Sequence, residues 1–196
     1  MKKIPTMYER VFEGHKIVGI TPVFTNDLCR EALERGTPTV KYDGAACFMH
    51  KGFLYKRIDL GKAKKSYTGF ELILCEEKPD EVTGHWPAWV RTDKDDPADR
   101  WFIQAKNTFF DMGGRLADGS YEAVGPHFQG NPYNMEADTL IRHGEHVVML
   151  PDRSIEGVFL WLENNNHEGL VFWLDGKPAC KIKRSDFGLP WPVKKA

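Results

Sequence analysis

The chain has 196 residues, of which 41% are hydrophobic and 12% aromatic, and its formal net charge at pH 7 is −1. This length suits one domain, and the apolar share is enough for a packed core, which excludes a mainly disordered chain. The near-neutral charge excludes a strongly basic protein that coats nucleic acid, and no segment approaches the ~18 apolar residues of a transmembrane helix. We therefore expect a single domain over residues 1–196.

The first predicted elements are one helix and a run of strands. A cap at Thr25 or Asn26 and a stop at Gly36 predict a helix over residues 26–35. The Lys51-Gly52 dipeptide predicts a hairpin turn between two strands. The strand-like segments in this part of the chain are 37–42, 45–50 and 53–58.

The second half of the chain mixes helices with strands. Asp96-Pro97 predicts a helix start, with the helix reaching about Asn107, and the Asp118-Gly119 turn leads into a strand. Two more helices are expected at 135–143 and 154–163, and strands at 120–124, 169–174 and 179–183, the last two joined by a turn at 175–178. Many strands with few helices predict an α+β fold built on antiparallel sheet.

The ends of the chain and its cysteines bear on where the protein resides. The first ten residues include lysines and an arginine without an apolar stretch after them, which does not fit a secretory signal. The four cysteines form no CxxC pair and are widely spaced: Cys29, Cys47, Cys75 and Cys180. We interpret them as free thiols in a reducing compartment. We expect a cytoplasmic protein with no membrane association and no obligate protein partner.

Charge is distributed unevenly along the chain. Residues 51–65 contain six bases and one acid, residues 71–99 contain nine acids and three bases, and residues 177–195 contain six bases and one acid. The 51–65 stretch, together with Arg184, Lys194 and Lys195, is our candidate for contacts to phosphates. Ordinary solvated lysines account for the same pattern. Two histidines, His143 and His146, flank Gly144 and are interpreted as surface residues, with a metal pair as the alternative.

The most informative string is Val40-Lys41-Tyr42-Asp43-Gly44. A lysine ends an apolar strand there, and Asp-Gly turns the chain toward the next strand. A lysine in such a position can be desolvated and flanked by other cations, and both effects favour the neutral amine that nucleophilic attack requires. Taken alone, Lys-x-Asp-Gly describes a charged hairpin corner equally well.

Three later strings strengthen the chemical interpretation. Glu122 lies inside a predicted strand, and Glu168 precedes the apolar strand 169–174. Lys181 and Lys183 share one face of a strand, because alternate residues point to the same side. Together with Lys41 they supply a nucleophilic amine, two carboxylates and two phosphate-binding ammonium groups. A pocket so equipped can transfer a nucleotidyl group from a triphosphate.

This order of strings resembles motifs I, III, IV and V of the covalent nucleotidyltransferases, which comprise ATP-dependent DNA ligases, RNA ligases and mRNA capping enzymes. The matches run from Lys41 to Lys183, about three-quarters of the chain. Two strings look most similar to small ATP-dependent RNA ligases related to the vertebrate 5′–3′ RNA ligase: Lys41-Tyr42-Asp43-Gly44-Ala45-Ala46-Cys47 and Tyr121-Glu122-Ala123-Val124-Gly125-Pro126. The resemblance implies an antiparallel-sheet, ATP-grasp-like ligase adenylation domain.

The resemblance also implies a role for each matching residue. Lys41 would become the lysyl–AMP, and Asp43 would orient it and help bind the metal. Glu168 would bind the divalent metal, Mg²⁺ or Mn²⁺. The remaining nucleotide-binding residues would be Val40 beside the nucleophile, Arg57 at the ribose or the phosphate end, Glu122 at a ribose hydroxyl, and Lys181 and Lys183 at the α-phosphate.

The family also places an aromatic ring against adenine between motifs III and IV. Phe159 and Trp161 are the candidates here, and Phe159 is preferred. Phe159 also lies on the apolar face of the predicted helix 154–163, which is the pattern of a core residue. Both interpretations of Phe159 remain open at this point.

Two departures from the family pattern narrow the prediction. DNA ligases usually carry an arginine two residues after the motif I glycine, where this chain has Ala46. Thirteen residues follow Lys183, too few for the oligonucleotide-binding barrel of DNA ligases and capping enzymes, so no such barrel is expected.

The prediction is an ATP-dependent RNA ligase that uses ATP and Mg²⁺ and joins RNA 5′-phosphate and 3′-hydroxyl ends in RNA repair. The alternatives are a DNA nick ligase and a non-catalytic module that binds nucleotides or nucleic-acid ends.

Overall fold

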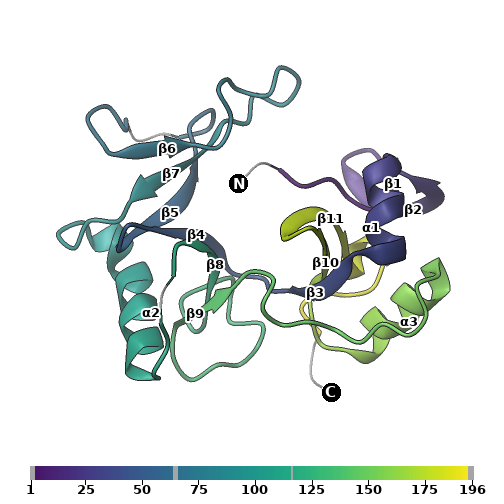
Figure 1. The fold of residues 1–196 in the computed structure, drawn as a ribbon. Coiled ribbons are helices and arrows are strands. Elements are labelled where there is room, and N and C mark those ends of the chain that lie inside the picture. Colours follow the sequence, from purple (N-terminus) through teal and green to yellow (C-terminus); the bar gives the residue numbers. More distant parts are fainter. Residues whose placement is uncertain (1–2, 64–65, 116, 194–196) are drawn as a thin grey trace. The chain divides into compact units, whose positions relative to one another are not determined.

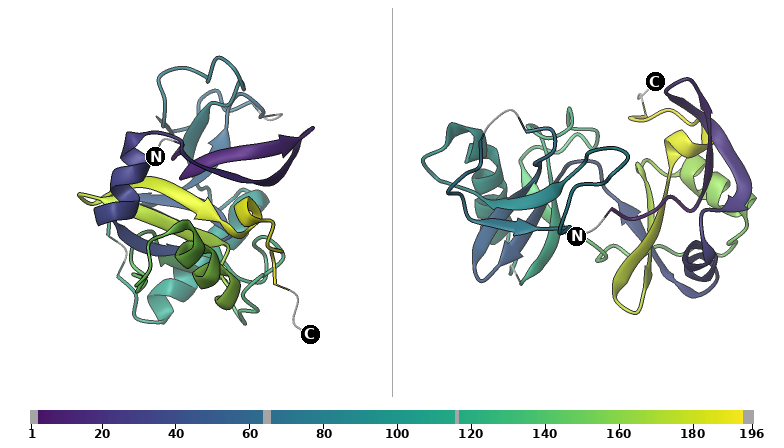
Figure 2. Two further views of the ribbon diagram at one scale, coloured as in Figure 1. Left: turned by 90° about the vertical axis from the view of Figure 1, so that its right-hand side faces the viewer. Right: turned by 90° about the horizontal axis from the view of Figure 1, so that it is seen from above.

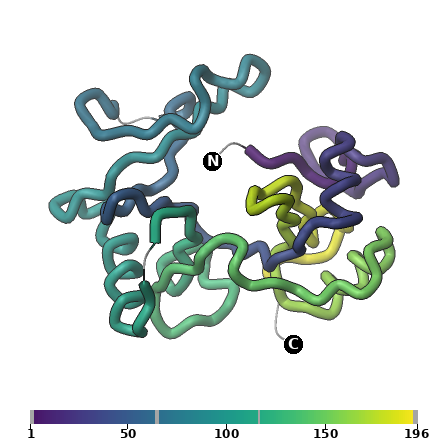
Figure 3. The backbone as a smooth tube through the Cα atoms, in the orientation of Figure 1, coloured from purple at the N-terminus to yellow at the C-terminus, as the bar shows by residue number. Residues whose placement is uncertain are grey.

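A computed structural model describes residues 3–63, 66–115 and 117–193. Within them the chain divides into two compact units, each described by itself below. Residues 44–143 form one, which we call the inserted unit, and residues 3–43 with 144–193 form the other, which we call the split unit. Figure 3 traces the backbone through both units. The chain is mixed α+β with antiparallel sheets and few helices, which confirms the predicted class.

The split unit contains two small antiparallel sheets (Figures 1 and 2). In the three-stranded sheet, β10 lies between β3 and β11, and the N-terminal hairpin of β1 and β2 forms the other sheet. The strands are β1 (Tyr8–Glu13), β2 (Lys16–Phe24), β3 (Thr37–Lys41), β10 (Gly169–Leu174) and β11 (Lys177–Lys183). The helices are α1 (Asp27–Arg35), α3 (Ile155–Asn164) and the short 3-10 helix η2 (Arg184–Phe187).

The core of the split unit joins helices to the three-stranded sheet. α1 begins where the Asn26 side chain accepts a hydrogen bond from the Cys29 amide at 3.0 Å, and it ends at Gly36, as predicted. Met7 and side chains of α1, α3, β10 and β11 are fully buried in this core, the latter being Cys29, Ala32, Val158, Leu162, Leu170, Phe172 and Cys180. The apolar stripe predicted for 154–163 is therefore confirmed at Val158 and Leu162.

The inserted unit is built on one six-stranded antiparallel sheet in the order β6-β7-β5-β4-β8-β9. Its strands are β4 (Ala45–His50), β5 (Phe53–Asp59), β6 (Leu72–Leu74), β7 (Pro87–Arg91), β8 (Gly119–Val124) and β9 (Thr139–Arg142). The helices are η1 (Pro97–Asp99) and α2 (Arg100–Asp111), and α2 packs against β5, β8 and β9. Ala105 of α2 is buried there against strand residues such as Cys47, Leu54, Tyr121 and Leu140.

The helix predicted at 135–143 is wrong. Residues Thr139–Arg142 form β9, which pairs antiparallel with β8 so that Thr139 is opposite Val124. The preceding bend is held by the buried Asp138 carboxylate, which accepts a hydrogen bond from the His127 amide at 3.0 Å. Pairing with β8 buries Thr139 and Leu140, and this tertiary gain outweighs the local helical pattern.

Other boundaries differ by a few residues. The last turn is tighter than predicted, because Asp175 and Gly176 adopt positive φ angles of 48° and 75° and let β11 start at Lys177. α2 continues to Asp111, beyond the expected end at Asn107. The four cysteines carry free thiols, as expected. In the described part of the chain, no helix has both the length and the apolar character to cross a membrane.

Candidate functional site

The three-stranded sheet brings two of the predicted lysines to one glutamate. Gly169 of β10 is opposite Lys41 on β3 and opposite Lys183 on β11. Glu168, which immediately precedes β10, is buried with 5% of its surface exposed. One carboxylate oxygen of Glu168 accepts a hydrogen bond from Lys41 Nζ, and the other accepts one from Lys183 Nζ. We call these three residues, with Lys181, the lysine–glutamate cluster.

Gly169 permits this arrangement because β10 and β11 approach closely there. A Cβ atom at Gly169 would lie 2.2 Å from the carbonyl oxygen of Ile182 and 3.0 Å from Cα of Lys183. Any side chain would therefore push β11 away from β10. The Glu-Gly pair of the sequence thus supplies a carboxylate and, directly after it, the space that lets Lys183 reach that carboxylate.

Lys181 lies two residues before Lys183 and points to the same face of β11. Its amide donates to Pro5 O at 3.0 Å, and its carbonyl accepts from the Met7 amide at 2.8 Å, so residues 5–7 line the outer edge of the strand. Burial, together with the positive charges of Lys183, Lys41 and Arg10 and against the opposing effect of Glu168, lowers the pKa of Lys181 to about 8. Two amines thus bind a single carboxylate and a third amine interacts electrostatically with all three groups, which leaves an excess of positive charge.

The lowered pKa of Lys181 predicts how stability changes with pH. Below pH 8 the folded and unfolded states both hold the proton, so folding carries the full cost of burying the charge, about 3 kcal/mol. Between pH 8 and 10.5 the folded state has lost the proton while the unfolded state keeps it, so stability rises. Lys181→Met should therefore raise the free energy of unfolding by about 3 kcal/mol at pH 7, and the gain should shrink as the pH rises from 8 to 10.5.

Urea unfolding at pH 7 and at pH 10 measures this difference. Lys177→Met is the matched control, because Lys177 is an exposed lysine at the start of the same strand. A gain from Lys181→Met that is the same at both pH values would come from packing alone and would contradict the charge argument.

Asp43 and Tyr42, beside the nucleophile candidate, have partners that the sequence did not indicate. Asp43 Oδ2 accepts a hydrogen bond from the Trp191 indole at 2.8 Å. The Tyr42 hydroxyl is 2.6 Å from His146 Nδ1, and the Tyr42 ring meets the ring of His167 edge-on at 5.9 Å. Burial lowers the pKa of His167, which favours its neutral form. Tyr42, next to Lys41, and His167, next to Glu168, are therefore held by contacts between their rings.

The two adenine-stacking candidates lie in different surroundings on α3. The Phe159 ring meets the ring of Phe187 edge-on at 5.6 Å, a packing contact that its place on the apolar helix face predicts. The Trp161 ring instead stacks on His167 at 6.0 Å. Trp161 thus contacts His167, the residue next to Glu168, whereas Phe159 contacts Phe187.

Glu122 of the inserted unit is held at both carboxylate oxygens. Oε1 accepts a hydrogen bond from the Gly44 amide at 3.1 Å, and Oε2 is 2.8 Å from His143 Nε2. Gly44 must be small, because a Cβ atom there would lie 2.2 Å from the carbonyl oxygen of Ala123. Glu122 is therefore tied to the Asp-Gly turn that follows Lys41. His143, predicted as a surface residue, is half-buried as the partner of Glu122.

The basic stretch 51–65 is partly neutralised within the inserted unit. Lys56 forms an ion pair with the buried Asp99, and Lys62 Nζ is 2.9 Å from His85 Nε2. The guanidinium of Arg57 lies over the Trp89 ring, 5.7 Å from its centroid. Lys64 and Lys65 lie outside the described residues. The predicted contact of Arg57 with a nucleotide stays a prediction.

The predicted phosphate contact at Arg184 is wrong. Only 4% of Arg184 is exposed, and its guanidinium donates to the carbonyl oxygens of Leu162, Asn165 and Pro190. Arginine has five N–H donors, and here they bind main-chain oxygens of the segments on either side of it. Arg184 is a structural residue of the split unit. Lys194 and Lys195, the other candidates at this end, lie outside the described residues.

The candidate metal ligands are two carboxylates, which would bind an ion together with the phosphates of a substrate. Among the residues that the structure describes, no group of three or more His, Cys, Asp or Glu side chains could hold a metal ion. Mg²⁺ usually binds through one or two carboxylates together with waters and substrate phosphates. Glu168 and Asp43 are the candidate carboxylates, and here the oxygens of Glu168 accept from Lys41 and Lys183 while Asp43 Oδ2 accepts from Trp191. They do not form a site that would hold the ion without substrate.

The predicted site residues divide between the two units. Val40, whose amide donates to His146 O at 2.9 Å, belongs to the split unit together with Lys41, Asp43, Phe159, Glu168, Lys181 and Lys183. Arg57 and Glu122 belong to the inserted unit. Within the split unit the structure brings Lys41, Glu168 and Lys183 into direct contact. No known protein family matches the chain, and no curated protein is significantly similar to it in sequence.

Proposed function

We propose that the chain is an ATP-dependent RNA ligase that works through a covalent lysyl–AMP. The observation that supports this most directly is the lysine–glutamate cluster, in which Lys41 and Lys183 share the buried Glu168 carboxylate. The order of the motifs along the chain supports the same proposal. The proposal includes a nucleotidyltransferase fold and a cytoplasmic location.

The charge of the cluster suits a triphosphate. One carboxylate offsets only one of three amines, so the cluster attracts an anion, and ammonium groups stabilise the charge that develops on a phosphoryl group during transfer. Lys183 and Lys181 take this role, and Lys41, at the end of β3, is the nucleophile. Trp161 is the ring that the contacts favour for adenine.

The first step transfers AMP from ATP to Lys41. Lys41 Nζ attacks the α-phosphorus of ATP, a nitrogen–phosphorus bond forms, and the bond from that phosphorus to the bridging oxygen breaks. Pyrophosphate leaves with the electron pair. The Lys41 ammonium loses two protons overall, one before attack and one after, and Glu168, which already accepts its hydrogen bond, is placed to take the first.

The next two steps join the RNA ends. An oxygen of the RNA 5′-phosphate attacks the phosphorus of the lysyl–AMP and releases the Lys41 amine. An RNA 3′-hydroxyl then attacks the 5′-phosphate, a phosphodiester bond forms, and AMP leaves. Mg²⁺ or Mn²⁺ held by Glu168 and Asp43 would offset negative charge on the phosphates. The choice of RNA over DNA rests on the resemblance to RNA ligases.

Intact mass tests this proposal directly. After incubation with ATP and Mg²⁺, the protein should gain the mass of one AMP, and pyrophosphate should remove it. Pyrophosphate treatment comes first in a parallel sample, because protein purified with AMP already attached would show no gain. A protein that neither gains nor loses this mass would contradict the ligase proposal and favour a module that only binds nucleotides.

A comparison of ends then separates RNA ligase from DNA nick ligase. Matched RNA and DNA substrates with 5′-phosphate and 3′-hydroxyl ends are incubated with the adenylylated protein. We expect the protein to seal only the RNA ends, or to seal them much faster than the DNA ends. Preferred sealing of DNA nicks would contradict the RNA assignment and leave the lysyl–AMP chemistry in place.

A further inference from the structure

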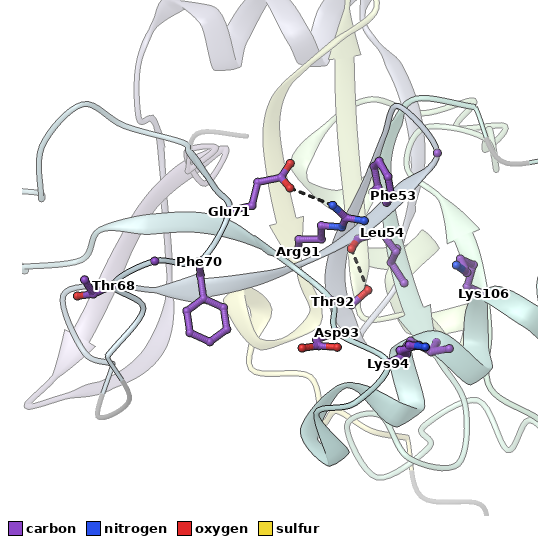
Figure 4. A pocket seen from close by; sticks show the side chains of 13 residues that line it. Phe53, Leu54, Thr68, Phe70, Glu71, Arg91, Thr92, Asp93, Lys94 and Lys106 are labelled. Atoms are coloured by element: carbon purple, nitrogen blue, oxygen red, sulfur yellow. Dashed lines mark hydrogen bonds and ion pairs between the residues drawn. The ribbon is translucent and has the colours of Figure 1, made fainter.

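A groove of about 710 Å³ opens on the inserted unit (Figure 4). Its walls come from the start of β5, the end of β7, α2 and the segment 68–71 that leads into β6. Every residue that lines it belongs to the inserted unit, so the groove contains no residue of the lysine–glutamate cluster. Its volume lies within the ~300–1,000 Å³ of sites for small ligands, which is enough for a nucleotide.

Flat, exposed groups lie along the groove. Phe53 and Phe70 are large apolar side chains that expose 42% and 40% of their surface. The Arg91 guanidinium lies over the Phe53 ring, 3.4 Å from its centroid, and also pairs with Glu71 at 3.1 Å. Glu71 in turn accepts a hydrogen bond from Tyr55. Arg91 is thus fixed in place, and rings and guanidinium planes are the groups on which nucleic-acid bases stack.

Positive charge lies next to these flat groups. Lys94 follows β7 and is exposed, and Lys106 lies on α2. Among the described residues, neither lysine forms an ion pair with a carboxylate, whereas the charge of Arg91 is offset by Glu71. Figure 4 shows Phe70 on one side of Arg91 and the two lysines on the other. The groove therefore combines an exposed ring with two ammonium groups and one exposed carboxylate outside the Arg91–Glu71 pair, that of Asp93.

We propose that this groove binds a single-stranded segment of the RNA, with a base stacked on Phe70 and backbone phosphates at Lys94 and Lys106. Proteins bind single-stranded nucleic acids with this combination of aromatic side chains, on which bases stack, and positive charge. The inference rests on the proposed function, because RNA is the substrate proposed there, and it assigns a place where the strand is held. A folded protein partner would instead need a broader apolar surface than two half-exposed rings.

Fluorescence anisotropy of a labelled, unstructured oligoribonucleotide tests the groove. Phe70→Ala should weaken binding about 5- to 150-fold, the range for loss of one stacked base. Lys94→Ala combined with Lys106→Ala should reduce the slope of log K against log salt by about 0.7 for each phosphate that the protein no longer neutralises. If the double variant does not fold, Lys94→Ala alone carries the salt test, because Lys94 is exposed.

Two matched controls lie in the same unit. Phe110→Ala removes a phenylalanine that is 48% exposed at the end of α2, and Lys78→Ala removes an exposed lysine that pairs with Glu81. Both controls should bind the RNA as the unaltered protein does. If the groove variants also bind like the unaltered protein, the groove proposal is overturned. A labelled acidic peptide that binds more tightly than RNA, and whose binding the same variants abolish, would overturn it in favour of a protein ligand.

The mass experiment separates this proposal from the proposed function. If the protein gains AMP and the groove variants bind RNA normally, the groove proposal is contradicted and the ligase proposal stands. If the protein gains no AMP and the groove variants lose RNA binding, the ligase proposal is contradicted and the groove proposal is supported.

Discussion

Lys41→Ala should abolish the transfer of AMP from ATP to the protein. The expected loss is roughly 10⁴- to 10⁶-fold, the scale seen when a covalent nucleophile is removed, because the amine that would form the bond to phosphorus is gone. Intact mass after incubation with ATP and Mg²⁺ measures the loss, and thermal unfolding shows whether the variant is folded.

Two further variants distinguish the role of the Lys41 amine as nucleophile from the role of its positive charge. Lys41→Arg keeps a cation beside Glu168 but provides no neutral amine, since arginine stays protonated in proteins, so it should fold normally and gain no AMP. Lys177→Ala removes an exposed lysine and should gain AMP as the unaltered protein does. An AMP adduct on Lys41→Ala would show that another residue is the nucleophile.

Glu168→Gln should destabilise the protein by about 3–5 kcal/mol, because it removes one partner from buried ion pairs and leaves Lys41 and Lys183 without a carboxylate. The same variant should lose adenylylation, since the proton acceptor of Lys41 and the proposed metal ligand are both removed. Urea unfolding measures the first effect and intact mass measures the second.

The destabilisation of Glu168→Gln has a specific signature. It should be partly reversed by Lys41→Met in the double variant, because one unpaired charge is then gone. It should also be reduced by pyrophosphate, an anion that can bind the two amines that have lost their carboxylate. Glu145→Gln, at an exposed glutamate of the same unit, is the matched control and should leave stability unchanged. A fully stable and active Glu168→Gln would exclude Glu168 from the site.

The elements with strong local signals could be predicted from the sequence. α1 has a capping asparagine and a stop glycine, and β4 and β10 have the predicted ends because turn residues flank them. The segment 135–143 had no such signal. A strand of four residues shows too few positions to distinguish its period from that of a helix, and only the pairing with β8 decides it.

The site was predictable where spacing carries geometric information. Alternation along β11 places Lys181 and Lys183 on one face, and the position of Glu168 before a strand places it beside them. The partners of the other site residues depend on long-range packing. Trp191 is 148 positions from its partner Asp43, and His143 is 21 positions from Glu122, so no local pattern could connect them.

The insertion of one unit into the other sets an order of assembly during synthesis. Residues 45–142 form their six-stranded sheet without help from later residues, so this part can fold while the rest is still being translated. Lys41 and Glu168 are 127 positions apart, and β10 and β11 must leave the ribosome before the lysine meets its carboxylate. A nascent or truncated chain thus carries Lys41 without Glu168, and the lysine–glutamate cluster that we propose as the reactive centre is among the last features to form.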